Sequence, residues 1–111
     1  MNFNSINTDR LLEWKRKNNL KKSVYRCILD AYRRAHEFHN GNYRYNLLVL
    51  ALPSQAKQAI TEGYLRPCGK EINRASNWYS LTDKGVALVS TLEPVIGEWD
   101  KDKNFVLFMT I

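Results

Sequence analysis

The sequence predicts a mainly helical α+β domain with a β-hairpin in its second half. Apolar side chains recur at helical spacing over residues 24–38. A second, shorter helical pattern over 53–62 ends at Gly63, a residue that readily closes a helix. Residues 65–81 are typical of two strands around a polar stretch, Gly69 through Asn77. With 111 residues in all, these segments suit a single domain, residues 1–111.

The front half contains two predicted helices. We expect a short basic helix from about Asp9 to Lys17, ended by Asn18-Asn19. Ser23 is the candidate cap of the longer helix that follows. The stretch Asn40-Gly41-Asn42 ends that helix, because these residues tolerate the left-handed conformation.

Residues 46–52 are apolar on most sides and are therefore expected to be buried. We interpret them as a short helix, because Pro53 then fits the first turn of the next helix. In that next helix, 53–62, the apolar positions are Ala56, Ala59 and Ile60, which leaves the remaining faces polar.

After the hairpin, Thr82 is expected to cap a helix over 83–92, which Pro94 stops. Residues 100–104 have the alternating charges of a turn. Residues 105–111 are the most apolar run, and we expect them to be strand-like. An exposed strand of this kind would promote aggregation, so it must be covered. We favour a contact in a homodimer; a closing strand in the same monomer is the alternative.

The net charge of +6 lies in the front half of the chain. Residues 1–50 contain ten Lys and Arg against four Asp and Glu, whereas 51–111 contain seven of each. This excess favours an anionic partner, although a merely solvated basic surface is the simpler interpretation.

Several function classes receive no support from the sequence. Cys27 and Cys68 are too few for a disulfide framework, so reduced thiols and an intracellular, cytoplasmic setting are expected. There is no apolar run near the roughly 20 residues that span a bilayer, and no signal-peptide core. Nucleophile-elbow, Walker and HExxH motifs are missing, so we expect no enzyme and no cofactor. His36 and His39 lack further ligands at suitable spacing, so no metal site is expected.

Two segments carry a family resemblance. Glu62-Gly63-Tyr64-Leu65 ends a helix and starts a strand, and Tyr79-Ser80-Leu81-Thr82-Asp83-Lys84-Gly85 ends a strand and starts a helix. With the polar loop between them, they resemble winged helix-turn-helix regulators of the broad MarR/PadR-like kind. The resemblance covers 23–92 as the winged-helix core, with 1–22 as a basic extension and 93–111 as a tail.

The resemblance implies binding of double-stranded DNA. The helix over 53–62 would enter the major groove, where Gln can pair with adenine and Lys with guanine. The candidate base contacts are Ser54, Gln55, Lys57 and Gln58. On the hairpin, Lys70 and Arg74 would contact phosphate or the minor groove. For both sets the alternative is an ordinary solvated surface.

A further basic group precedes the long helix. Lys21 and Lys22 stand where positive charge opposes the helix dipole, and free N–H groups at a helix start can bind an anion. We therefore expect Lys21, Lys22 and Arg26 to bind the DNA backbone; a merely basic linker is the alternative.

Taken together, these features favour a small, dimeric, DNA-binding transcriptional regulator. The main alternative is a winged-helix protein-interaction adaptor or inhibitor that does not bind DNA.

Overall fold

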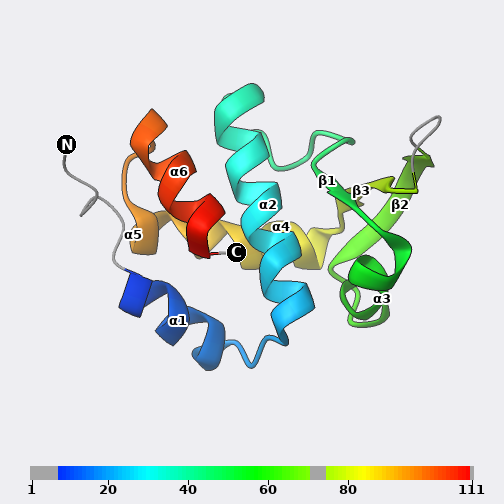
Figure 1. Ribbon diagram of the computed structural model, residues 1–111, viewed down its shortest axis with the longest axis horizontal. Helices are drawn as coiled ribbons and strands as arrows, with labels where there is room; N and C mark the ends of the chain where they lie inside the picture. Colours follow the sequence, from blue (N-terminus) through cyan, green and yellow to red (C-terminus); the bar gives the residue numbers. More distant parts are fainter. Residues whose placement is uncertain (1–7, 71–74, 111) are drawn as a thin grey trace.

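The computed structural model describes residues 8–70 and 75–110, apart from the side chains of 69 and 70 (Figure 1). The elements, in chain order, are α1 (Thr8–Lys17), α2 (Lys22–Phe38), β1 (Val49–Ala51), α3 (Pro53–Thr61), β2 (Leu65–Lys70), β3 (Asn77–Leu81), α4 (Asp83–Ser90), α5 (Glu93–Ile96) and α6 (Lys101–Thr110). The predicted mainly helical α+β class is confirmed.

The strands form one antiparallel sheet in the order β1-β3-β2. Leu65 pairs with Leu81 and Val49 pairs with Tyr79, so β3 lies between the other two strands. The predicted hairpin is therefore confirmed, with a bulge between Pro67 and Gly69 in β2. Figure 1 shows the sheet to the right of α2, with α3 beside it.

Helix α2 is the centre of the core. It packs against α3, α4, α6 and β1, and Figure 1 shows it crossing the middle of the molecule. Its buried residues follow the helical spacing expected from the sequence: Val24, Tyr25, Cys27, Ile28, Leu29, Ala31, Tyr32 and Ala35. The predicted end of this helix is also confirmed, because Asn40 and Gly41 both have positive φ.

The prediction of a helix over 46–52 is wrong. Residues 49–51 form β1, which pairs with β3, and the Leu48 N–H also donates to the Tyr79 carbonyl. Burial was expected correctly, since Leu48, Val49 and Ala51 are all buried. A short apolar run does not distinguish a buried strand from a buried helix, and here a distant strand supplies the partner for its backbone.

The strand-like interpretation of 105–111 is wrong as well. The charged stretch expected to be a turn begins α6, and the Asp100 carboxylate accepts the N–H groups of Asp102 and Lys103. Leu107 is fully buried, and it lies one turn after the buried Lys103. Burial at a spacing of four residues fits a helix with one buried side, and this helix packs against α2. Residue 111 lies outside the described residues.

Two smaller predictions about helix ends also differ from the structure. Lys21, not Ser23, occupies the cap position of α2, and Ser23 lies inside the first turn. The helix expected over 83–92 ends at Ser90, before Pro94. Pro94 is the second residue of the short helix α5, in the first turn, where its missing N–H is tolerated.

The Thr82-to-Gly85 turn behaves as the sequence predicts. The Thr82 hydroxyl oxygen accepts the Gly85 N–H at 3.1 Å and donates to the Gly63 carbonyl. A Cβ atom at Gly85 would collide with the Tyr64 carbonyl oxygen, so only glycine lets α4 approach the start of β2 this closely. This packing holds the end of α3 and the base of the hairpin together.

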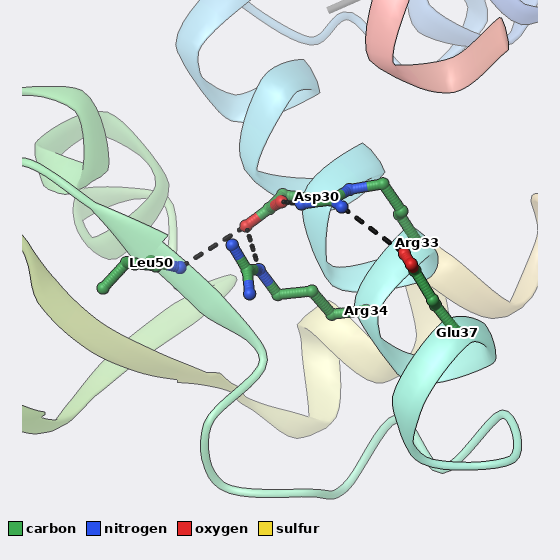
Figure 2. A network of polar contacts seen from close by, with 5 residues as sticks. All are labelled: Asp30, Arg33, Arg34, Glu37 and Leu50. Atoms are coloured by element: carbon green, nitrogen blue, oxygen red, sulfur yellow. Dashed lines mark hydrogen bonds and ion pairs between the residues drawn. The ribbon is translucent and has the colours of Figure 1, made fainter. Parts of the chain in front are cut away.

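Asp30 joins α2 to the edge of the sheet (Figure 2). One carboxylate oxygen accepts from the Arg33 guanidinium at 2.9 Å. The other accepts from Arg34 at 3.0 Å and from the backbone N–H of Leu50 at 3.4 Å. The Asp30 side chain is only 16% exposed, so it pairs with two arginines and accepts an edge-strand N–H in a largely dry position.

We predict that Asp30→Ala lowers the free energy of unfolding by about 2 kcal/mol or more, because it leaves Arg34 and the Leu50 N–H without this acceptor and Arg33 with Glu37 alone. Urea denaturation measures the loss. The matched control is Glu37→Ala, because among the described residues Glu37 pairs with Arg33 alone, at 3.5 Å, and is 33% exposed. That change is expected to cost less than about 1 kcal/mol. Equal losses in the two variants would contradict the role assigned to Asp30.

Candidate nucleic-acid interface

Helix α3 presents one polar face to solvent. Ala56 and Ala59 are fully buried on its inner side, where α3 packs against α2. The opposite side carries residues spaced three and four apart, and these therefore share one face: Ser54, Lys57, Gln58 and Thr61. We call these four residues the α3 outer face. Ser54, Lys57 and Thr61 are exposed and Gln58 is half-buried, so most of the face is accessible to a ligand.

The two glutamines of α3 already make hydrogen bonds within the protein. The Gln55 side-chain oxygen accepts the Leu52 N–H at 3.0 Å, so this residue caps its own helix from the flank of the outer face. The Gln58 amide donates to the Glu62 carboxylate at 3.0 Å. In the part of the chain that the structure describes, Ser54 and Lys57 have no such side-chain hydrogen bond. They are therefore the more available of the four predicted base contacts.

The start of α2 is strongly basic. Lys21 caps the helix and Lys22 begins it, both are exposed, and the first turn contains no acidic residue and no side-chain cap. The last turn of α1, immediately before, adds three more cations, which the sequence analysis did not single out as contacts. We call the whole group the α1–α2 basic patch: Lys15, Arg16, Lys17, Lys21, Lys22 and Arg26.

The predicted site residues do not form one cluster. In Figure 1 the end of β2 and the start of β3 lie at the upper right and the α1–α2 connection lies at the bottom, with α3 between them in this view. Lys70 is the last residue of β2, but its side chain is not described, and Arg74 lies outside the described residues. By contrast, Arg26 does come close to α3, because it lines the same small cavity as Gln55.

Cations on the sheet side of the molecule are mostly paired. The Arg44 guanidinium is 2.7 Å from the Asp83 carboxylate and holds the pKa of that carboxyl below its usual value. Arg66 donates to the Ser80 hydroxyl at 3.0 Å. Lys84 donates to the Glu62 carbonyl, at the end of α3. These contacts join residues far apart in the chain, so no local sequence signal could have predicted them.

The cations of the predicted interface are less engaged. Within residues 8–70 and 75–110, Lys57, Lys21, Lys22 and Arg26 make no side-chain hydrogen bond and no ion pair with another residue. An unpaired surface cation can exchange its counterion for a phosphate without breaking an internal contact. This difference separates Lys57, Lys21, Lys22 and Arg26 from the paired Arg44 and Arg66.

The two histidines serve packing. His36 Nε2 lies 2.8 Å from the Tyr43 hydroxyl, which donates to the Glu93 carboxylate at 2.8 Å, and the His36 ring stacks on Trp99. His39 stacks on Tyr45 at 3.6 Å. No group of three or more His, Cys, Asp or Glu suited to a metal occurs in the described part of the chain. None of its helices combines the length and the apolar character needed to cross a membrane.

Comparison with models of protein families, with curated proteins and with solved structures gave no match.

We predict that His36 makes stability depend on pH. Burial lowers the pKa of His36 below 6.5, Glu93 opposes this shift, and Lys103 adds to it. The unfolded chain therefore binds a proton more readily than the folded protein. The contribution of neutral His36 to the free energy of unfolding is fully present above pH 6.5. It is lost as the pH falls from 6.5 through the lowered pKa of the folded protein.

Urea denaturation at a series of pH values between neutral and mildly acidic measures this decline. His36→Gln should make it shallower. An identical pH profile for His36→Gln and the original protein would show that His36 is not the group responsible.

Proposed function

We propose that this protein is a small winged-helix protein that binds double-stranded DNA and acts as a transcriptional regulator. The α3 outer face would enter the major groove, and the α1–α2 basic patch would bind phosphates. The observation that carries the proposal is the exposure of the α3 outer face. The helix packs on the core through two alanines and leaves its polar side, with the unpaired Lys57, on the surface.

The dimensions and chemistry of α3 suit this role. An α-helix with its side chains is about 10–12 Å across, and the major groove is about 12 Å wide. Lys57 is a donor suited to guanine, and Ser54 can donate or accept. Gln58 can pair with adenine if it exchanges its hydrogen bond with Glu62 for one to the base.

The arrangement around α3 also supports the proposal. The chain order α2-β1-α3-β2-β3, with the sheet order β1-β3-β2, is compatible with a winged helix whose wing is the β2–β3 hairpin. In the view of Figure 1, α3 lies between the α1–α2 connection and the end of β2. Phosphates flank the major groove on two sides as well. Lys21, Lys22 and Arg26 would bind one row, and Lys70 and Arg74 the other.

We predict that the affinity for a generic DNA duplex falls steeply with salt, and that Lys21→Ala/Lys22→Ala makes this dependence shallower. Each phosphate contact contributes about 0.9 to the slope of log K against log salt concentration, so the double variant should lose about twice that amount. Fluorescence anisotropy with a labelled duplex at several salt concentrations measures the slope. Lys57→Ala should weaken binding at every salt concentration.

The matched control is Lys101→Ala, which removes one exposed charge at the start of α6, away from α3 and from the α1–α2 connection (Figure 1). It should leave the slope unchanged. Failure of the protein to bind duplex at low salt would overturn the proposal. Selection of bound duplexes from a random pool would then show whether binding is specific for a sequence or general.

A second candidate function rests on α6. Its residues Phe105, Phe108 and Met109 are 54%, 70% and 71% exposed, and their spacing of three and four places them on one side of the helix. Exposed apolar groups at such spacing are typical of a protein contact. In the DNA-binding proposal this side holds a second copy of the chain in a homodimer. In the alternative, an adaptor or inhibitor that does not bind DNA, it holds a different protein.

We predict that the protein is a dimer at tens of micromolar and that Met109→Asp shifts it to the monomer, because an unpaired carboxylate in an apolar contact is strongly unfavourable. Light scattering measures the mass. The matched control is Phe38→Asp, because Phe38 is also exposed (60%) but lies at the end of α2 and not on α6. This variant should remain a dimer. A monomeric original protein would exclude the dimer and leave the α6 surface to another partner.

A further inference from the structure

The C-terminal end of α3 is held in place by contacts from the start of α4. The Lys84 ammonium donates to the Glu62 carbonyl at 2.6 Å, and the Thr82 hydroxyl donates to the Gly63 carbonyl. A positive side chain at the last carbonyls also suits the negative end of the helix dipole. Gly63 has a φ of +84°, so the chain turns out of the helix directly after Glu62. The backbone of Glu62, which closes α3, therefore has a fixed position.

The Glu62 carboxylate orients a side chain of the preceding turn. Gln58 lies four residues earlier, and its Nε2 donates to Glu62 Oε2 at 3.0 Å. An ionised carboxylate only accepts hydrogen bonds, whereas an amide donates through its nitrogen and accepts through its oxygen. The bond to Glu62 is therefore possible in one of the two flipped orientations of the Gln58 amide. In that orientation the nitrogen faces Glu62 and the oxygen Oε1 points to the other side.

The groups of Gln58 that remain unused match adenine. The amide nitrogen has a second proton, and Oε1 accepts no hydrogen bond from the residues that the structure describes. Bidentate pairing with adenine uses these two groups, because an N–H donates to N7 and the oxygen accepts from the N6 amino group. Besides exchange of the bond to Glu62, Gln58 thus has a second route to adenine, in which that bond is kept. Guanine has acceptors at both N7 and O6, so it lacks the donor that Oε1 needs.

We propose that Glu62 is a positioning residue of the DNA-binding surface, and that it fixes the Gln58 amide for an A·T base pair in the major groove. This inference rests on the proposed function, because it assigns a role within DNA binding. Gln58 makes the contact to the base, and Glu62 acts through it. The Glu62 charge also repels phosphates near the end of α3, so duplexes that offer Gln58 no adenine bind more weakly.

The test compares base preference, because a merely structural pair between Gln58 and Glu62 would not affect it. Selection from a random pool gives a bound duplex, and each of its A·T pairs is then replaced singly by G·C. In fluorescence anisotropy, the original protein should bind about tenfold more weakly when one particular A·T pair is replaced. Gln58→Ala should lose this preference, which identifies the base pair that Gln58 contacts.

Glu62→Gln should still bind the duplex, but its preference at that base pair should fall to about threefold or less. The substituted amide both donates and accepts, so it permits both orientations of the Gln58 amide. A ratio of two affinities is compared, so the general gain in affinity from losing a negative charge cancels. The matched control is Glu13→Gln, which removes the same charge from an exposed position on α1. This variant should keep the tenfold preference.

Three results would each overturn the positioning role and leave the proposed function intact. These are an unchanged preference in Glu62→Gln, an unchanged preference at every base pair in Gln58→Ala, and equal binding of all the duplexes by the original protein. Failure of the original protein to bind any duplex at low salt is a different outcome. It would overturn the proposed function, and the role of Glu62 with it.

Discussion

The position of every candidate surface depends on the burial of α2. This helix packs against α3, α4, α6 and β1, and eight of its residues are buried. Asp30 adds a directional link, because it accepts hydrogen bonds from two arginines of α2 and from the β1 backbone. A helix held on several sides has little freedom to rotate or slide. The α3 outer face, the α1–α2 basic patch and the cavity are therefore all placed relative to one rigid element.

Pairing, rather than the number of cations, distinguishes the surfaces of this protein. Arg33, Arg34, Arg44 and Arg66 hydrogen-bond to carboxylates or a hydroxyl within the fold. Lys21, Lys22, Arg26 and Lys57 have no such partners among the described residues, and they lie around the start of α2 and on α3. A net charge of +6 by itself indicates only an anionic partner. The positions of Lys21, Lys22, Arg26 and Lys57 are the observation on which the proposal of a phosphate-binding region rests.

The cavity and α3 are physically connected. Gln55 caps α3 through its side chain, its carbonyl lies 3.8 Å from the Cys27 Sγ, and it also lines the cavity. Burial raises the pKa of Cys27 to about 11, and the nearby Asp30 adds to that rise, so the thiol is neutral at physiological pH.

The sequence by itself determined the features that depend on neighbouring residues. Local patterns predict the helical spacing of α1, α2 and α3, the Thr82 cap, the positive φ of Gly63 and the hairpin. The structure agrees with each of these. It also placed Ser54 and Lys57 on an exposed polar face. Local patterns work there because helix periodicity and capping involve residues within a few positions of each other.

Only the tertiary structure decided what depends on distant partners. Residues 46–52 and 105–111 are apolar runs whose conformation their own residues do not specify; β3 makes part of the first a strand, and α2 packs against the second as a helix. The sequence likewise does not indicate the internal hydrogen bonds of Gln55 and Gln58. It also does not indicate the separation of the hairpin end from Lys21 and Lys22, or the cavity beside Arg26. The physical reason is that burial, pairing and cavities arise from contacts between elements. The sequence pattern of one element does not specify which other elements pack beside it.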